Sequence, residues 1–487
     1  DAQWTAFGNA MENQLQQLPG MTNDLTVTFK AGESKDLFRV FTVRFPGDLA
    51  GYQYQFDALV VSSADAAALV AHIKIGDTAG EALVSNGQGW FSGMELFQDR
   101  ACYFAPPARP AAISMSQTGE YFNLDITAQS DNGARLEALR TTTSEEILHL
   151  LESTFLCVYT DQSEWFATNR VISRNEPVNF KQVSRNGTRE GVRPIEMESR
   201  IWYVSQDGGI MFSMAYDDVS TSYNSRPESL LASHLVKDIK RMALQRKTGE
   251  NNANRLWLVR NDGRLICAIV IETQEITAYS EWVPADGGLV KEVAVDGNEA
   301  VWACIERNGT TTIERMLEQE TTCLQAYRDV VPDPAGQLPP MPVFDGKTVW
   351  VQEDGHYFGP YLVQGGIVTT DAFSGPVRVG LWIAPEFESM PYLDVLKNED
   401  VVFRPGRVHS ILAHVLNTQS LALGANGRPP KEVSLLGHDS NLDDPTPYSG
   451  PVRLHGLLGI AVGPTVTITQ ARPGMLRVQD FTPGVKH

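Results

Sequence analysis

The chain has 487 residues, of which 42% are hydrophobic and 20% are charged, as in an ordinary globular protein with room for about two to four domains. The longest apolar stretches, residues 266–271 and 457–462, are far too short to cross a bilayer, so no stable membrane insertion is expected. The net charge of −19 argues against wrapping nucleic acid through phosphate contacts, although an acidic wall would let DNA slide past it.

Residues 1–85 differ in texture from the rest and form a predicted β-rich region of uncertain role. The chain starts at Asp1 rather than Met and shows no signal peptide, which is compatible with a leader removed earlier. Residues 11–18 predict a short helix. Residues 25–30 and 38–45 alternate apolar and polar side chains, which predicts two half-buried strands joined by a turn at 31–34. The Ala-rich residues 64–73 are compatible with a helix or a strand.

A Trp followed by a tight polar turn recurs along the middle of the chain. In four segments the Gly of an Asp-Gly or Asn-Gly turn follows five to seven residues after Trp202, Trp257, Trp302 or Trp350. Each segment predicts an apolar strand, a two-residue hairpin turn with positive φ, and a second strand. Recurrence every 45 to 55 residues is typical of a repeated sheet unit, with the four Trp side chains in the blade cores.

The repeat extends backward less cleanly. Phe155 lies 47 residues before Trp202, and Tyr103 lies 52 residues before Phe155. Six segments predict a mainly β fold, a β-propeller of about six four-stranded blades over residues 86–378. A β-sandwich with chance spacing of aromatic residues is the alternative.

Two helices and a linker are predicted within and after the blades. Ser144 followed by two Glu resembles a helix cap, and Pro227 stands at a favoured first-turn position, so a helix is expected after each. These inserted helices would cover a sheet edge or contact a neighbouring subunit. Residues 331–343 carry five Pro and predict an extended linker.

Residues 379–487 predict a separate antiparallel β domain. Residues 465–469 alternate Thr with apolar side chains, which indicates a strand with its Thr face outward. Arg404-Pro-Gly and Pro473-Gly indicate turns.

No catalytic, cofactor or metal site is predicted. The chain lacks a nucleophile elbow, a Gly-rich phosphate loop, a zinc-protease motif and an EF-hand loop. Asp439, Asp443 and Asp444 are candidate calcium ligands, but a solvated acidic loop is the better interpretation. His409 and His414 are five residues apart, which is not a helical ligand spacing.

The Cys and the glycosylation sequons have plain interpretations. The odd number of Cys and the lack of paired spacing predict core thiols in a reducing cytoplasm, at residues 102, 157, 267, 304 and 323. The sequons at Asn186 and Asn308 fall where a hairpin turn would favour Asn-Gly.

An ordered set of short runs, from Phe97-Gln-Asp-Arg to Gln470-Ala-Arg-Pro, resembles the tail tube nozzle proteins of short-tailed bacteriophages, also called tail hub or tail tubular protein B. The set begins with Phe97-Gln-Asp-Arg, Arg109-Pro and Tyr121-Phe-Asn. It continues with Cys157-Val-Tyr-Thr, Glu164-Trp, the Trp202 segment, residues 230–235, Leu256-Trp-Leu-Val-Arg-Asn-Asp-Gly, Glu281-Trp, Val301-Trp, Ile313-Glu-Arg-Met, Pro447-Tyr-Ser-Gly and Gln470-Ala-Arg-Pro. The resemblance covers about residues 90–480, and the first 80 residues do not fit the family's opening.

The resemblance implies a structural virion protein, made in the host bacterial cytoplasm and assembled as a hexameric ring below the tail adaptor protein. Its propellers would surround and gate the channel through which genomic DNA leaves without sequence-specific binding. Tail fibres or spikes are further implied partners, and no enzymatic activity is expected. The alternative is a propeller enzyme acting on surface polysaccharide, a tail depolymerase, because propellers carry enzymes and scaffolds alike.

Overall fold

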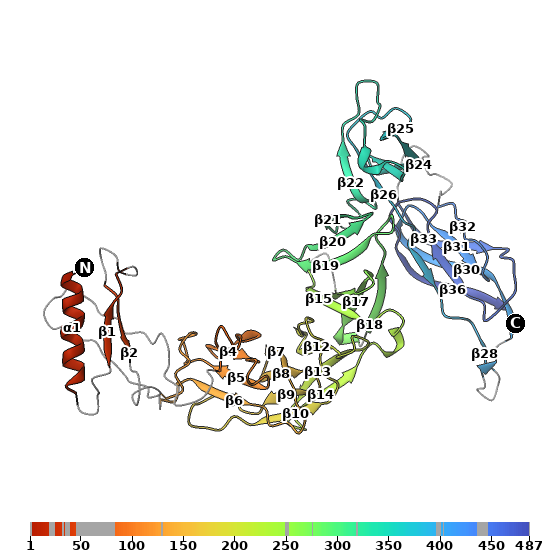
Figure 1. The fold of residues 1–487 in the computed structure, drawn as a ribbon. Coiled ribbons are helices and arrows are strands. Elements are labelled where there is room, and N and C mark those ends of the chain that lie inside the picture. The colour runs from red at the N-terminus through yellow and green to blue at the C-terminus, as the bar shows by residue number, and fades with distance from the viewer. Residues whose placement is uncertain are drawn as a thin grey trace. The chain divides into compact units, whose positions relative to one another are not determined.

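The computed structural model describes residues 2–18, 25–31, 34, 39–44, 83–127, 130–248, 253–274, 276–317, 320–395, 401–402, 404–435 and 447–486. The described chain is mainly β, as predicted, and divides into two compact units, Asp1–Glu228 and Ser229–His487 (Figure 1). The division into three domains at residues 85 and 378 stays a prediction. Residues 64–73 and the acidic residues Asp439, Asp443 and Asp444 lie outside the described residues.

The N-terminal elements are a helix on a two-stranded sheet. Strands β1 (Thr26–Phe29) and β2 (Phe41–Arg44) pair antiparallel, which confirms the two predicted strands. Helix α1 spans Ala2–Gln16, so it begins well before the short helix predicted at residues 11–18. Leu25 and Val27 are buried against Met11 and Leu15 of the helix. The carboxylate of Glu12 accepts the amide of Val27 at 2.7 Å, which ties the helix to the strand.

Six antiparallel sheets follow one another in the described chain between residues 93 and 381, which confirms the predicted number of repeats. The first unit contains three of them. Sheet 1 has strands β3 (Gly93–Phe97), β4 (Arg100–Phe104), β5 (Ala112–Met115) and β6 (Arg135–Ala138), and sheet 2 has β7 (Ile147–Glu152), β8 (Leu156–Thr160), β9 (Glu164–Ala167) and β10 (Phe180–Ser184). Sheet 3 has β11 (Ile195–Met197), β12 (Arg200–Val204), β13 (Met211–Asp217) and β14 (Ser222–Pro227).

The second unit continues the series. Sheet 4 has β15 (Ile239–Gln245), β16 (Asn254–Arg260), β17 (Leu265–Ile271) and β18 (Ile276–Trp282), and sheet 5 has β19 (Leu289–Val295), β20 (Val301–Arg307) and β21 (Thr310–Arg315). Sheet 6 has β22 (Gln325–Val330), β23 (Thr348–Glu353), β24 (His356–Gln364), β25 (Ile367–Val368) and β26 (Val377–Leu381).

Sheets 1 to 4 are four-stranded meanders like the blades of a propeller, whereas sheet 5 has three strands and sheet 6 has five. The recurring aromatic residue lies on or just before the second strand of every sheet, from Tyr103 on β4 to Trp350 on β23. The described sheets between residues 93 and 381 are thus a series of short meanders and not the β-sandwich that was the alternative. Closure of the six sheets into a ring stays a prediction.

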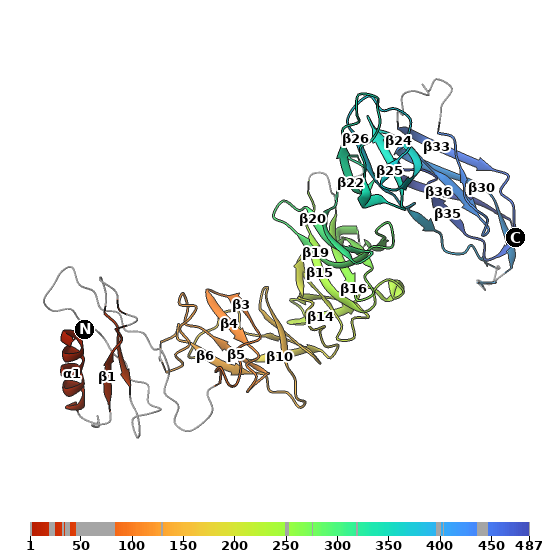
Figure 2. The same cartoon turned by 45° about the horizontal axis from the view of Figure 1, so that its top comes forward.

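Consecutive sheets within a unit share apolar cores face to face. Strand β8 is buried on both faces: Leu156 and Val158 pack in a core with sheet 1, and Cys157 and Tyr159 pack in a core with sheet 3. Trp257 of sheet 4 packs in a core with Val290 and other residues of sheet 5. Strands β15 and β16 accordingly lie beside β19 in Figure 2.

The predicted two-residue turns occur at two of the four Trp segments. Asn308 and Gly309 after Trp302, and Asp354 and Gly355 after Trp350, all have positive φ. The turns after Trp202 and Trp257 are longer, and in the latter only Gly263 has positive φ. Asn186 lies on the connection from sheet 2 to sheet 3, so the hairpin predicted there is wrong.

The prediction that Trp302 is a blade-core residue is wrong. Trp202, Trp257 and Trp350 are buried, but Trp302 is 37% exposed. Strand β20 alternates, so Val301, Ala303 and Ile305 face the core of sheets 4 and 5 while Trp302 faces the other side. Its indole N–H donates to the Asp296 carboxylate at 3.0 Å.

Both predicted inserted helices are wrong. The segment after Ser144 forms strand β7, because its polar groups bond the next hairpin instead of capping a helix. The Glu145 carboxylate accepts the Thr160 hydroxyl at 2.8 Å, and Asp161 accepts the backbone amide of Glu146 at 2.9 Å. The segment after Pro227 contains only one 3-10 turn, Leu230–Ala232. Leu230 and Leu231 there are exposed, so no apolar face is available to pack a helix.

The Pro-rich residues 331–343 are not a linker between domains. They connect β22 and β23 within sheet 6 and include the start of a 3-10 turn, Pro342–Phe344. Leu338, Met341 and Phe344 are buried in the core of that sheet. The segment is therefore a packed part of sheet 6.

The predicted C-terminal antiparallel strands are present beyond residue 381. They are β27 (Glu386–Glu388), β28 (Asp394–Val395), β29 (Val401–Val402), β30 (Pro405–Thr418), β31 (Ala422–Ala425), β32 (Lys431–Glu432), β33 (Tyr448–His455), β34 (Ala461–Val462), β35 (Val466–Thr469) and β36 (Val478–Lys486). The long strand β30 pairs with β33, β34 and β36. On β35, Val466 and Ile468 are buried and the Thr side chains are half-buried, in line with the predicted Thr face.

The unequal burial of two repeat Trp residues gives a direct test of this packing. Trp257→Ala removes a side chain that is 1% exposed and should cost about 3–5 kcal/mol of the stability of the second unit. Trp302→Ala should cost about 1 kcal/mol, because that ring already meets water. Urea unfolding followed by circular dichroism measures both; equal losses would contradict the assignment of faces.

Candidate functional site: buried arginines and carboxylates between sheets

The described residues contain no group of three or more His, Cys, Asp or Glu side chains placed to hold a metal ion. His414 Nδ1 shares a hydrogen bond with Asp480, 2.7 Å away, and His409 is exposed on the same strand. All five Cys are free; three are buried and two are half-buried. Burial raises the pKa of Cys102 and of Cys157 to about 12, so these two thiols stay protonated near neutral pH.

Four arginines are buried among the residues that the structure describes: Arg100, Arg135, Arg260 and Arg307. A guanidinium cannot be deprotonated in a protein, and its N–H groups must find acceptors when water is removed. Each of these four arginines donates to at least one backbone carbonyl of a connecting segment, and Arg135, Arg260 and Arg307 also bond carboxylates; Nε of Arg260 has no partner among the described residues. They are the most distinctive polar feature of the sheets.

Arg100 begins strand β4 and is 2% exposed. Its Nη1 donates to the carbonyls of Ser116 and Gly133 at 2.7 and 2.8 Å. Burial lowers the pKa of its guanidinium, and the carbonyl acceptors offset part of the lost hydration. Arg100 thus fastens the long connection between β5 and β6 to its own sheet.

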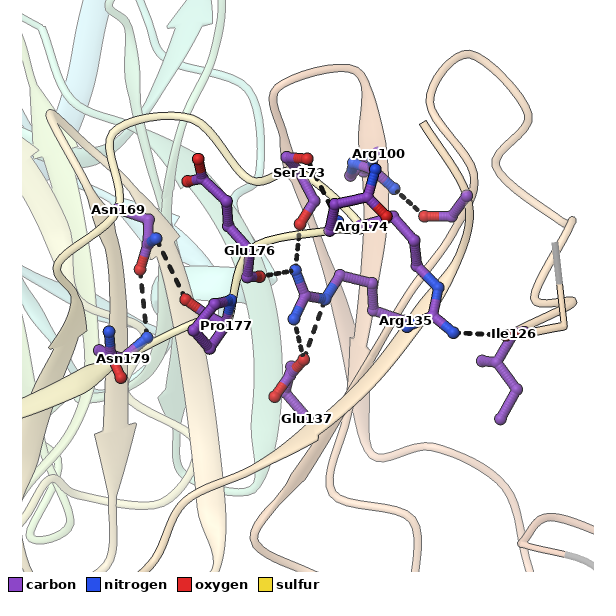
Figure 3. Close-up of polar contacts among 12 residues, drawn as sticks. Arg100, Ile126, Arg135, Glu137, Asn169, Ser173, Arg174, Glu176, Pro177 and Asn179 are labelled. Carbon is purple, nitrogen blue, oxygen red and sulfur yellow. Dashed lines mark hydrogen bonds and ion pairs between the residues drawn. The ribbon is translucent and has the colours of Figure 1, made fainter. Parts of the chain in front are cut away.

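Arg135 begins strand β6 and joins sheet 1 to sheet 2 (Figure 3). Its Nη1 donates to the carbonyls of Ser173 and Glu176, on the connection between β9 and β10. Its Nε and Nη2 bond one oxygen of Glu137 at 2.9 and 2.6 Å. One guanidinium therefore holds a strand of sheet 1, a loop of sheet 2 and its own counter-ion.

The loop that Arg135 binds is braced from further points. Arg174 Nη2 donates to the carbonyl of Ile126 at 2.8 Å, and Asn169 and Asn179 bond each other across the loop at 3.1 Å (Figure 3). The amide of Ile172 donates to Gln98 Oε1 at 2.9 Å. The β9–β10 connection is therefore fixed to sheet 1 along most of its length.

Arg260 and Arg307 each hold a connecting segment in the second unit. Each ends the second strand of its sheet, and each bonds the segment that leads into the first strand. Arg260 Nη1 donates to the carbonyl of Leu235 at 3.2 Å, and Arg307 Nε donates to that of Ala285 at 3.0 Å. Their counter-ions, Asp262 and Glu314, lie within the same sheets.

Two buried carboxylates complete the polar set in sheet 2. Glu145 accepts the hydroxyl of Thr160 at 2.8 Å and that of Ser163, beside a cavity of about 180 Å³. Glu164 is fully buried and accepts the Ser184 hydroxyl at 2.5 Å. Burial raises the pKa of Glu164, although its hydrogen-bond donors oppose the shift.

Glu164 lies close to the junction with sheet 3. It is within 3.4 Å of the Thr188 hydroxyl, and the backbone of Thr188 forms an isolated bridge with Ser205 after β12. The neighbouring Asn186 donates to the Tyr203 hydroxyl at 3.0 Å. Hydrogen bonds thus continue from a carboxylate of sheet 2 to a strand of sheet 3.

The sequence did not identify these groups. An Arg at a strand end looks like a surface residue, and backbone carbonyls, which every residue has, leave no mark in the sequence. One signal was available: Arg260 directly follows the apolar run Leu256–Val259, where a charged side chain has little access to water.

Comparisons with known proteins give no family. No protein-family model and no curated protein matches the chain. Among solved structures, the chain is similar to Hsv2 of Kluyveromyces lactis, with 9% identity, a TM-score of 0.31, and 49% of this chain and 67% of that chain covered.

Two further solved structures are similar at the same low level. One is the extracellular domain of the putative one-component system BT4673 from B. thetaiotaomicron, with 10% identity, a TM-score of 0.29, and 73% and 40% of the two chains covered. The other is a family 43 arabinoxylan arabinofuranohydrolase from Bacillus subtilis, with 10% identity, a TM-score of 0.20, and 80% and 93% covered. We draw no function from likenesses this weak. No described helix is long and apolar enough to cross a membrane.

The bond pattern of Arg135 predicts a large stability loss on truncation. Arg135→Met keeps the aliphatic length but leaves two carbonyls and the Glu137 carboxylate without their donor. The cost should be about 3–5 kcal/mol in the first unit. Arg140→Met, at an exposed arginine, is the matched control and should change stability by less than about 0.5 kcal/mol. Urea unfolding measures the free energy of unfolding of both variants. Equal losses in Arg135→Met and Arg140→Met would refute a bridging role for Arg135.

The raised pKa of Glu164 predicts a pH-dependent stability. A raised folded-state pKa means that the folded protein holds the proton more tightly than the unfolded chain, so the stabilisation is present at low pH. It is lost as pH rises from the unfolded value, about 4.3, through the higher folded value. The stability of Glu164→Gln relative to the natural chain should therefore increase over that range. A difference that stays constant with pH would contradict the assignment.

Proposed function

We propose that the chain is a structural virion protein, a subunit of the tail nozzle of a short-tailed bacteriophage. The observation that carries the proposal is the order of the family-like runs. The runs beginning at Phe97, Cys157, Trp202, Leu256 and Val301 fall on sheets 1, 2, 3, 4 and 5 in turn. Each run covers the same part of its sheet, on or next to the second strand.

The packing of the sheets supports a mechanical role as part of the wall of the tube. A wall around pressurised DNA must resist sliding of one sheet over the next. Shared apolar cores supply non-directional adhesion, and buried guanidinium–carbonyl bonds add directional contacts that fix the register between segments. Five donors on a rigid plane suit Arg to this task better than Lys.

The negative net charge supports a channel wall that DNA passes without binding to it. With 59 acidic and 40 basic residues, the chain repels a phosphate backbone. In the proposed assembly six copies form a ring below the adaptor, and the genome leaves along its axis. Fibres or spikes would dock on the outside. The protein would be made in the bacterial cytoplasm and end in the virion tail.

Native mass spectrometry of the purified chain, alone and with the adaptor, tests the proposal. The expected result is a ring of about six copies, with each interface repeated between neighbours because a closed heterologous ring requires it. Electron microscopy of the same sample should show an axial opening. A chain that stays monomeric in both samples and hydrolyses surface polysaccharide would reject the nozzle in favour of the depolymerase.

A further inference from the structure

We infer that the cavity between the β6–β7 connection and strands β9 and β10 binds a uronic acid residue, a sugar ring that carries a carboxylate. The cavity has a volume of about 180 Å³, below the range of about 300–1,000 Å³ for drug-sized ligands, so it suits a single small ring. Arg140, Trp165, Gln182 and Arg185 are among its lining residues. The inference goes beyond the proposed function and does not depend on it.

Trp165 supplies the apolar wall of the cavity. On strand β9 its neighbour Phe166 packs in the core with sheet 3, so Trp165 points to the opposite side and packs against the core shared with sheet 1. The Trp165 ring is half-buried, and its Nε1 donates to the Ser163 hydroxyl at 2.6 Å. A ring that is held in one orientation and partly open suits the C–H face of a sugar.

Two amide side chains offer the hydrogen bonds that sugar hydroxyls need. Gln182 is paired with Trp165 across strands β10 and β9, so both side chains lie on one face of sheet 2. Gln182 Oε1 accepts Arg185 Nε at 3.5 Å, and Gln182 Nε2 has no partner among the described residues. Gln162 Nε2 donates to the carbonyl of Ser144 at 2.8 Å, whereas Gln162 Oε1 has no described donor. A donor and an acceptor are therefore available, and a hydroxyl group can bond to either.

Two guanidinium groups in the lining favour an anionic sugar. Arg140 and Arg185 are exposed, and neither forms an ion pair with a carboxylate of the described residues. Glu145 is the one carboxylate in the described lining; it is buried and already accepts the hydroxyls of Thr160 and Ser163. A carboxylate on the ligand would thus meet two unpaired guanidinium groups, whose planar donors match its geometry.

The same lining argues against two other uses of the cavity. Hydrolysis of a glycosidic bond needs two carboxyl groups about 5–9.5 Å apart, and the described lining supplies one. A nucleotide would have to place a base, a ribose and a phosphate in the same small space. Binding of an acidic sugar without cleavage is the use that this lining supports.

Saturation-transfer NMR of the full chain with simple glycosides tests the inference. Methyl β-D-glucuronide should bind with a dissociation constant on the order of 1 mM and should stay intact. Methyl β-D-glucoside, which lacks the carboxylate, should bind about tenfold more weakly, because the guanidinium groups then have no anion to bind. Acetate, which lacks the ring, should not compete.

Variants of the lining separate the two parts of the ligand. Arg140→Met and Arg185→Met should each weaken glucuronide binding about tenfold and leave glucoside binding unchanged, since only the carboxylate loses a partner. Gln182→Leu should weaken the binding of both glycosides. Arg170→Met changes an exposed arginine of the same sheet outside the cavity and should change neither affinity. Circular dichroism confirms that the variants fold.

Several outcomes would overturn the inference. They are a glucuronide that does not bind or is cleaved, a glucoside that binds as tightly, and acetate that competes, which would reduce the cavity to a simple anion site. Unchanged glucuronide binding in both Arg140→Met and Arg185→Met would overturn it as well. Tighter binding of uridine monophosphate than of the glucuronide would assign the cavity to nucleotides instead.

Discussion

A guanidinium that is cut off from water has five N–H groups and a charge that it cannot lose, so its acceptors must be in place before it can be buried. In the described part of this chain, carbonyls of segments that connect strands accept from all four buried arginines, and a carboxylate also accepts from three of them. A connection that bonds a buried Arg cannot move without leaving that charge unsatisfied. This constraint fixes connecting segments, normally the mobile part of a β protein, and at Arg135 it fixes a loop of sheet 2 to a strand of sheet 1.

The apolar cores and the arginine bonds have complementary roles. Cores shared by successive sheets favour contact but tolerate some sliding, because the hydrophobic effect has no direction. The bonds from Arg135 to Ser173 and Glu176 specify one register between sheets 1 and 2. At the next junction, between sheets 2 and 3, Glu164 accepts hydrogen bonds but costs stability when ionised, because burial raises its pKa. That cost suggests a junction retained for specificity more than for stability.

Much of the fold was predictable because it rests on local chemistry. The 45–55-residue period and the Asn-Gly and Asp-Gly turns led to six sheets and to the hairpins at Asn308 and Asp354, since positive φ is a property of the turn itself. The predictions that failed depend on distant partners. Ser144 and the two Glu after it resemble a helix cap until Thr160 and Asp161 supply their bonds, and Trp302 resembles Trp257 until the faces of sheet 5 are known. The buried arginines were not predicted, because only the fold brings their carbonyl and carboxylate acceptors near; the apolar run before Arg260 was the one signal in the sequence.

The central claim is that the buried guanidinium of Arg135 couples sheets 1 and 2, and amide hydrogen exchange tests it most directly under native conditions. Exchange in the natural chain is compared with exchange in Arg135→Met, followed by mass spectrometry of peptides. The account predicts faster exchange in β6 and also across residues 168–179 and strands β9 and β10 of sheet 2, with the second unit unchanged. Faster exchange confined to sheet 1 would contradict the coupling.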